Sequence, residues 1–429
     1  MKTNIRILLL ILLMTFFIAS GKESYSQGVL KAGMARVEIT PSLPVQLYGY
    51  SSRKTLSTGV HDPLFARVIV FGNNGNRFVL ISTDIGSFND ELFTAIKKDL
   101  MEKFKIKESE IILSAIHSHS TPIVGLTSTR LNENNIKYTG ELMLKLTSAV
   151  GEAIAGMKPV TIGMNTGSSP VGSNRREMSS DGTIKLGRNP YGPTDKDVQV
   201  MKVSATDGSF NIALFDYATH ATSLGPDNML ISGDVLGLAA QFVEKILGNK
   251  TVAPVFAGAS GDIDPWYRIL PGFNEEQGWI PETVLLGTLL GEEVIINYRK
   301  INETSQGGTV SSMTYTLECN RNTRNESNGS NSEVQSGTVP VNITVARVGD
   351  EVAFVGFSVE MLTEIGMAIK EASPFKYTFI ITHANGSSGY LPPSYLYKEG
   401  GYEVTSTKFE IGSAEKVVKQ TLTMLYNLK

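Results

Sequence analysis

The 429-residue sequence contains only one cysteine, five histidines and two tryptophans. Since Cys319 has no second cysteine to pair with, the chain forms no intramolecular disulfide and builds no thiolate metal site. Lysine and arginine number 39 against 42 acidic residues, a formal net charge of −3, and no basic block interrupts this balance. We therefore expect no nucleic-acid partner. A chain without disulfides must rely on a large apolar core, and this length can supply one.

Long apolar runs are also missing, except near the N-terminus. Lys2 and Arg6 are followed by an almost unbroken apolar run over residues 7–18 and by small residues at 19–21. This pattern is typical of a secretory signal peptide, so we interpret residues 1–27 as a signal and expect a periplasmic or secreted protein. No cysteine follows the run, and no other run is long enough to span a bilayer. We expect no stable membrane anchor after cleavage; an uncleaved N-terminal anchor is the alternative.

Apolar periodicity in the remaining chain, residues 28–429, predicts alternating strands and helices. The predicted strands cover residues 66–71, 78–82, 110–115, 211–215, 252–256, 352–357 and 377–382. The predicted helices cover residues 92–104, 142–154, 235–247, 282–298, 360–372 and 414–426. Residues 320–337, rich in Asn, Ser, Arg and Gly, are interpreted as an exposed loop or hairpin between strands. This alternation predicts an α/β fold with mixed β-sheets flanked by helices, in a single large domain.

Two of the five histidines follow the strand predicted at 110–115. His117 and His119 are two positions apart, and on an extended chain such residues project to the same side. Neutral imidazole is a favoured zinc ligand, so the pair can face one metal at the end of the strand. Two polar residues that merely satisfy a loop would give the same pattern.

Other candidate ligands also follow predicted strands. His220 lies just beyond the strand at 211–215 and Glu360 just beyond that at 352–357. Without cysteine, a zinc site must use nitrogen and oxygen ligands. A carboxylate at a helix start is equally explained by the helix dipole. In the glycine-rich turn at 258–265, Asp262 and Asp264 can bind metal, act as acid or base, or hold the turn.

Six short motifs occur in order from about residue 33 to residue 419. They are Gly-Met-Ala-Arg-Val-Glu-Ile-Thr-Pro at 33–41, Tyr-Gly-Tyr at 48–50, His-Ser-His-Ser-Thr-Pro at 117–122, Thr-His-Ala-Thr-Ser at 219–223 with Ile-Ser-Gly-Asp at 231–234, Asn-Gly-Ser-Ser-Gly-Tyr at 385–390, and Gly-Tyr-Glu with Ser-Thr at 401–407. Together they resemble the catalytic domain of the neutral, non-lysosomal ceramidases. The resemblance implies a zinc-dependent amide hydrolase with a single catalytic domain.

Carried over position by position, the resemblance also implies roles for individual residues. The implied zinc ligands are His117, His220, Glu360 and Tyr390. The residues implied to bind the substrate and polarise its scissile amide are His119, Arg175 and Tyr402, with a backbone contact from Gly49. In the resulting hypothesis, zinc-activated water attacks the carbonyl and these side chains stabilise the oxyanion. Asp264 takes or delivers the proton.

The sequence departs from the family pattern in places that bear on the substrate. Asp264 replaces a serine of the family's Gly-Asp-Val-Ser-Pro turn, Ala221 replaces a glycine, and Glu360 lacks the usual preceding Pro-Gly. Because the chain ends soon after the Tyr402 motif, we expect no C-terminal immunoglobulin-like domain. The substrate is expected to be a small molecule, lipid or glycoconjugate. Three alternatives stay open: a zinc hydrolase for carbohydrate or glycoconjugate, a non-catalytic exported binding protein, and a closed structural metal site.

Overall fold

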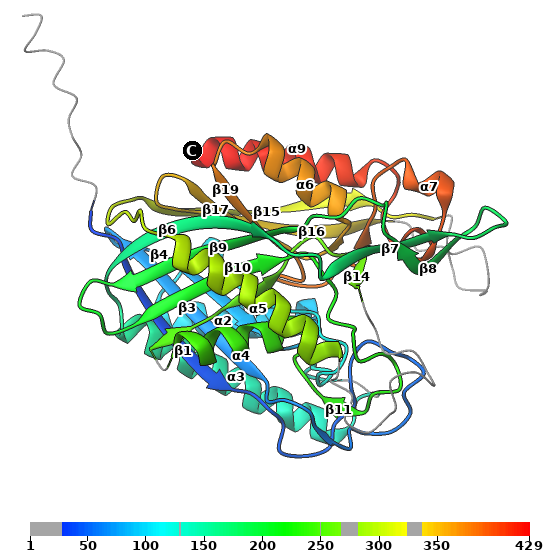
Figure 1. Cartoon of the computed structure of the whole chain (residues 1–429), viewed down its shortest axis with the longest axis horizontal. Coiled ribbons are helices and arrows are strands. Elements are labelled where there is room, and N and C mark those ends of the chain that lie inside the picture. The colour runs from blue at the N-terminus through cyan, green and yellow to red at the C-terminus, as the bar shows by residue number, and fades with distance from the viewer. Residues whose placement is uncertain (1–27, 128–129, 249, 267–281, 324–336) are drawn as a thin grey trace, which may run out of the picture.

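The computed structural model describes residues 28–127, 130–248, 250–266, 282–323 and 337–429 (Figure 1). The signal peptide expected at 1–27 lies outside these residues. Within the described part of the chain, no helix combines the length and the apolar character needed to cross a membrane. The domain boundaries at 28 and 429 stay a prediction.

A sheet of nine strands forms the centre of the protein. Its strands are β1 (Lys31–Glu38), β3 (Phe65–Asn73), β4 (Asn76–Thr83), β5 (Ile111–Ala115), β6 (Lys158–Ser168), β9 (Asp197–Ala205), β10 (Asn211–Tyr217), β12 (Thr251–Val252) and β13 (Val255–Ala257). The order is β12-β10-β9-β6-β1-β3-β4-β5, with β13 also paired to β10. The pairs β4–β5, β10–β12 and β10–β13 are parallel, so the sheet is mixed.

Twist brings the two ends of this long sheet together. Each strand is rotated against its neighbour by roughly 20–25°, and over so many strands the rotation accumulates. The Ser82 hydroxyl in β4 donates to the carbonyl of Val255 in β13, at 2.6 Å. Just beyond the strands, Ser118 and Ala221 form an isolated parallel bridge. The segments that follow β5 and β10 therefore meet, although their strands lie far apart in the sheet order.

A second sheet packs against the first. It contains β15 (Val310–Asn320), β16 (Thr338–Val348), β17 (Val352–Phe357) and β19 (Tyr377–Ile381), in the order β15-β16-β17-β19. Side chains alternate across a strand, and β17 follows this rule. Phe354 packs with Phe71 and Phe78 of the larger sheet, whereas Val355 and Phe357 pack in the cluster on the opposite face.

Helices cover the outer faces of both sheets (Figure 1). On the larger sheet these are α2 (Asp90–Phe104), α3 (Glu133–Ala155), α4 (Asp234–Leu247) and α5 (Glu282–Lys300). On the smaller sheet they are α6 (Thr363–Ala372) and α9 (Ser413–Leu428). The result is four layers, helix–sheet–sheet–helix, which confirms the predicted α/β fold with mixed sheets flanked by helices.

Several short elements carry candidate site residues that the two large sheets do not contain. They are β7 (Gly172–Met178), β8 (Ile184–Asn189) and β14 (Ile263–Pro265), which form one small sheet, and β18 (Glu360–Met361) with β20 (Tyr390–Leu391), which form another. Also short are β2 (Gly59–Val60), β11 (Leu230–Ile231), η1 (Glu108–Glu110), α7 (Leu396–Glu399) and α8 (Tyr402–Thr405).

Several predicted elements need correction. The helix predicted from residue 360 begins at Thr363, and Glu360 belongs to strand β18 instead. The strand predicted at 252–256 is two short strands, because Pro254 lacks the N–H that a continuous ladder requires. The four strands β6–β9, between residues 158 and 205, were not predicted.

Candidate metal centre

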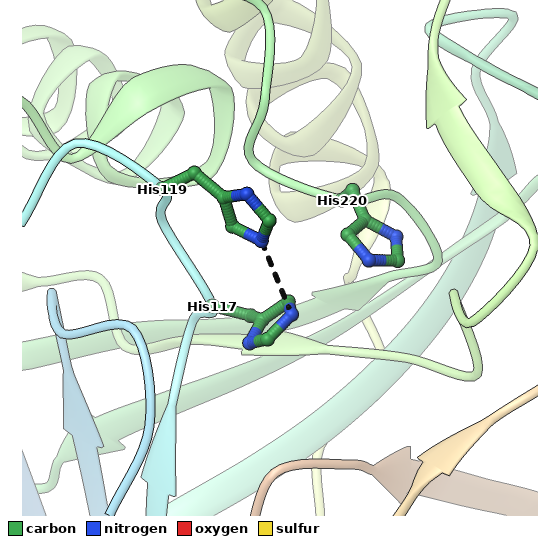
Figure 2. Close-up of side chains that lie close together, drawn as sticks. All are labelled: His117, His119 and His220. Carbon is green, nitrogen blue, oxygen red and sulfur yellow. Dashed lines mark hydrogen bonds between the residues drawn. The ribbon is translucent and has the colours of Figure 1, made fainter. Parts of the chain in front are cut away.

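His117 and His119 approach each other through a turn, not along an extended strand. β5 ends at Ala115, and His117 has a φ of +62°, in the left-handed region. The expectation that an extended chain aligns the two residues is therefore wrong, although their side chains do converge. Their Nε2 atoms lie 3.4 Å apart (Figure 2).

Backbone carbonyls orient the rings of His117 and His220. Nδ1 of His117 lies 2.8 Å from the Gly86 carbonyl, and Nδ1 of His220 lies 2.7 Å from the Ser260 carbonyl. Because a carbonyl only accepts, each Nδ1 carries the proton and each Nε2 keeps its lone pair. Metal-binding histidines are oriented by the same kind of bond to the ring nitrogen that does not bind the ion.

Glu360 and Tyr390 are partners across a two-residue parallel ladder. β18 pairs Glu360 with Tyr390 of β20, and the Glu360 amide donates to the Gly389 carbonyl at 2.9 Å. The phenol of Tyr390 also hydrogen-bonds the Glu360 side chain. Two residues thirty positions apart are thus held side by side at the site.

Potential ligand atoms of five residues gather in two groups that share His117. The groups His117–His119–His220 and His117–Glu360–His383 each bring one potential ligand atom per residue within 4.8 Å of the others. Glu360 Oε2 lies 3.6 Å from His117 Nε2 and 3.9 Å from His220 Nε2, beyond hydrogen-bond distance. Among the described residues this buried oxygen has no hydrogen-bond partner.

Burial favours the neutral form of three imidazoles of the cluster, His119, His220 and His383. Desolvation lowers the pKa of His220 to about 4 and that of His119 well below its ordinary value. Burial opposes the charged form of Glu360, but His117 and the other imidazoles lower its pKa well below the ordinary range. At neutral pH the cluster therefore offers nitrogen lone pairs and one negative charge, a set suited to a divalent cation.

Arg175 of β7 lies beside these ligands, held by two buried carboxylates. Its Nε donates to Glu403 at 2.8 Å and its Nη1 to Asp264 at 3.1 Å. Nη2 donates to the Gly261 carbonyl and, at 3.3 Å, to the Tyr390 hydroxyl. Nη1 also lies 3.5 Å from His220 Nε2. Nearby carboxylates outweigh the cost of burial and raise the pKa of Arg175 well above its ordinary value.

The remaining predicted contacts lie around the same cluster. Gly49 has a φ of +100°, and a Cβ there would approach His119 Cγ to 2.3 Å, so the position requires glycine. Tyr402 begins α8; its ring packs edge-on against Tyr390 at 5.6 Å and stays 46% exposed, which places it at the rim. The structure thus brings together all of the residues proposed for the site. Their roles stay predictions.

Three residues of this region were not assigned by the sequence. His383, beyond β19, stacks on His117 with ring centroids 3.7 Å apart. Tyr48 contacts the rings of both His117 and His119 at 5.5 Å. Glu403 bridges Arg175 and Arg176 at 2.8 Å each. His383 had a signal as a rare residue directly after a predicted strand, and Tyr48 and Glu403 lie within two of the motifs at 48–50 and 401–407.

Comparisons with known proteins point to one family. Residues 30–268, more than half of the chain, match the family model for neutral/alkaline non-lysosomal ceramidase, N-terminal. Neutral ceramidase B of Dictyostelium discoideum is 29% identical over 268 residues, 58% of this chain and 36% of that protein. The neutral ceramidase of Drosophila melanogaster is 26% identical over 259 residues, 55% and 36% of the two chains. The matches thus span little more than a third of the length of these relatives.

Solved structures extend the similarity in fold to nearly the whole chain. The crystal structure of neutral ceramidase from Pseudomonas aeruginosa superposes with a TM-score of 0.78 at 18% identity, covering 94% of this chain and 74% of that one. A ceramidase complexed with C2 gives a TM-score of 0.77, also at 18% identity, covering 94% and 75%. With the match of the family model over residues 30–268, we conclude that the chain belongs to the neutral/alkaline non-lysosomal ceramidase family.

Proposed function

We propose that this protein is an exported zinc-dependent hydrolase that cleaves an amide, N-acyl bond. The observation that carries the proposal is the convergence of the Nε2 atoms of His117 and His220, whose Nδ1 atoms bond backbone carbonyls, with a buried Glu360 oxygen that has no hydrogen-bond partner among the described residues. Such an arrangement costs free energy unless a cation completes it. Family membership supports the reaction class.

The residues present fit a zinc ion. His117, His220, Glu360 and Tyr390 would hold it, a nitrogen and oxygen set of the kind used in catalytic zinc sites. Three of these residues already bring their ligand atoms together, since Glu360 Oε2 lies 3.6 Å from His117 Nε2 and 3.9 Å from His220 Nε2. His119 Nε2, 3.4 Å from His117 Nε2, lies beside this set. When bound, zinc polarises a carbonyl and lowers the pKa of water towards about 7.

The chain's own side chains then orient the substrate. We propose that the one N–H of the neutral His119 imidazole and the Arg175 guanidinium donate to the scissile carbonyl as negative charge develops on its oxygen. Tyr402 at the rim donates its hydroxyl to the same group. Gly49 keeps the backbone close to His119, which fixes the wall of the site on that side.

Asp264 has its clearest role through Arg175. Its Oδ1 accepts from Arg175 Nη1 at 3.1 Å, and its Oδ2 lies 4.0 Å from Arg188 Nη1. An ion-paired carboxylate is a poorer proton acceptor than one without a cation beside it. We therefore propose that Asp264 mainly orients Arg175, with proton transfer as a secondary role.

A ceramide-like lipid is the first substrate to test, because one structural relative is a ceramidase complexed with C2. A carbohydrate or glycoconjugate is the second candidate. The observation that favours it is the charged Asp264–Arg188 pair beside the site, where the family has a serine and where hydroxyl-rich groups can hydrogen-bond.

The test is a hydrolysis screen with the full-length mature protein. N-acylsphingosine, N-acyl amino acids and glycan-derived amides are each incubated with the zinc-loaded protein, with and without chelator. We expect release of a fatty acid from N-acylsphingosine, its loss with chelator and its return with added zinc. Cleavage of the glycan amides alone would favour the second candidate. No chelator-sensitive cleavage of any substrate would leave the non-catalytic binding protein as the better account.

Export rests on the N-terminal pattern alone and has its own test. Lys2, Arg6 and the apolar run over residues 7–18 support cleavage near residues 21–27. We expect mass spectrometry of the protein recovered from the periplasm or medium to show a new N-terminus in this range. A full-length N-terminus in the cytosol would contradict export.

A further inference from the structure

His383 is a histidine of the cluster to which the proposed mechanism gives no role. It follows β19 and is 95% buried. Its ring lies flat against that of His117, with centroids 3.7 Å apart and planes 10° from parallel. The other ring neighbours of His117 meet it edge-on, at interplanar angles of 67–78°: Tyr48, His119 and His220. His383 therefore covers a face of His117 that none of these three rings covers.

The backbone is strained to produce this stack. His117 has a φ of +62° and His383 a φ of +52°, values that residues with a side chain rarely adopt. Backbone hydrogen bonds hold both conformations: the His117 amide donates to the carbonyl of Ile85, just beyond β4, at 3.0 Å, and the Ala115 amide of β5 donates to the His383 carbonyl at 3.2 Å. Strain of this kind persists where the surrounding structure over-determines it, and it concentrates at functional sites.

The stacked arrangement excludes a simpler role for His383 as a ligand beside His117. One ring atom of His383 lies within 4.8 Å of His117 and Glu360 ligand atoms. A ligand's lone pair lies in the plane of its ring, however, and two stacked rings 3.7 Å apart confine their lone pairs to two nearly parallel planes, so one ion cannot lie in both. Both rings cannot then aim at one ion. His383 instead restrains the ring of a ligand.

We propose that His383 is a positioning residue that fixes the imidazole of His117 in its metal-binding orientation. The Gly86 carbonyl bonds Nδ1 within the ring plane at 2.8 Å, and His383 blocks rotation of the ring out of that plane. This inference rests on the proposed role of His117 as a metal ligand. Partners that orient a metal ligand typically contribute about 10- to 100-fold to metal affinity.

Two apolar substitutions distinguish the contribution of the flat ring of His383 from that of its nitrogen atoms. His383→Phe keeps a planar ring against His117 but has no nitrogen, whereas His383→Leu fills similar space without a flat face. Zinc affinity is measured by chelator competition on the full mature chain, and urea unfolding of the metal-free proteins reports any difference in folding. We expect His383→Leu to bind zinc about 10- to 100-fold more weakly and His383→Phe to stay within about threefold of wild type. The cobalt-substituted His383→Leu protein should show an altered visible absorption spectrum.

These measurements distinguish an error in the role of His383 from an error in the proposed metal site. Wild-type affinity and an unchanged cobalt spectrum in His383→Leu would overturn the positioning role. An equal loss in Leu and Phe variants would also overturn it, because the nitrogen and not the ring face would then be required. If His117→Ala binds zinc like wild type, the proposed metal site fails instead.

Discussion

Two buried clusters of ionisable side chains in this protein differ in whether their hydrogen-bond donors and acceptors are balanced. The first surrounds Arg67, which is completely buried. Its Nε donates to Glu244 at 2.8 Å and its Nη1 to Asp84 at 3.0 Å. Asp84 accepts in addition from the Phe65 amide, and Glu244 from the Ala253 amide. Positive and negative groups alternate here, so the cluster satisfies itself with protein atoms.

The histidine cluster has no such internal balance. His117 and His220 use their N–H groups on backbone carbonyls, which leaves lone pairs facing the Glu360 carboxylate. A hydrogen-bond acceptor that faces other acceptors gains no hydrogen bond from them. Burial and charge therefore do not by themselves identify a binding site, since both clusters have them. A surplus of buried acceptors does identify one, because only a cation or a proton from outside can satisfy it.

The largest expected effect is loss of the metal when a proposed ligand is removed. His117→Ala and His220→Ala should each weaken zinc affinity by more than about 100-fold, beyond the range found for residues that only support a ligand. Zinc per chain, measured by mass spectrometry after dialysis, checks this. His61→Ala is the matched control, since His61 lies outside the cluster and pairs with Asp62. If either variant still binds one zinc ion per chain, the substituted histidine is not a metal ligand.

The second prediction concerns the self-satisfied cluster. Arg67→Met should lower the free energy of unfolding by about 3–5 kcal/mol, because it leaves the buried Asp84 carboxylate without its cation. Zinc content of the folded fraction should not change. Lys158→Met, which breaks an exposed pair with Asp207, should have a much smaller effect. Urea unfolding measures both. Similar losses in the two variants would mean that the buried Arg67 cluster contributes no more to stability than an exposed ion pair.

The third prediction tests whether Asp264 acts through Arg175. Asp264→Asn keeps the shape but removes the charge paired with Nη1. We expect kcat for the cleaved N-acyl substrate to fall by up to about 100-fold through misplacement of the guanidinium, with zinc content unchanged. Steady-state kinetics and metal analysis on the same preparation check this. Wild-type kcat would show that neither the ion pair nor proton transfer at Asp264 contributes.

The fourth prediction concerns an intermediate case, Asp216, whose effect should develop gradually with pH. Its carboxylate is buried, one oxygen has no partner in the described chain, and Lys370, Asp195 and Asp197 surround it. Burial raises the pKa of Asp216 to about 7. Between its ordinary pKa and about 7 the folded state keeps a proton that the unfolded state releases, so this group lowers stability as pH rises.

Asp216→Asn removes this titration. The stability of the variant relative to wild type should therefore increase from about pH 4.5 to about pH 7.5, as measured by urea midpoints of the metal-free proteins. A difference that is constant over this range would mean that Asp216 does not change its charge there. Its unpartnered oxygen would then need another explanation.

Much of the site was predictable from residues that follow strands. His117 and His220 were found because an apolar strand directly precedes each in the sequence. The sequence predicted a helix start at Glu360, because nothing in the neighbouring residues indicates that Glu360 forms a strand pair with Tyr390, thirty positions later. Strand β8, Ile-Lys-Leu-Gly-Arg-Asn, has only two apolar residues, too few for the alternation over 4–8 residues that identifies a half-buried strand. The face of His117 that His383 covers depends on left-handed backbone conformations, which single-sequence patterns do not encode.

Anomalous diffraction from crystals of the zinc-loaded protein, collected at the zinc absorption edge, tests the central claim most directly. We expect one strong peak in the anomalous difference map, bordered by His117 Nε2, His220 Nε2 and the Glu360 carboxylate. A peak elsewhere, or an ordered cluster without any peak at full zinc loading, would contradict it.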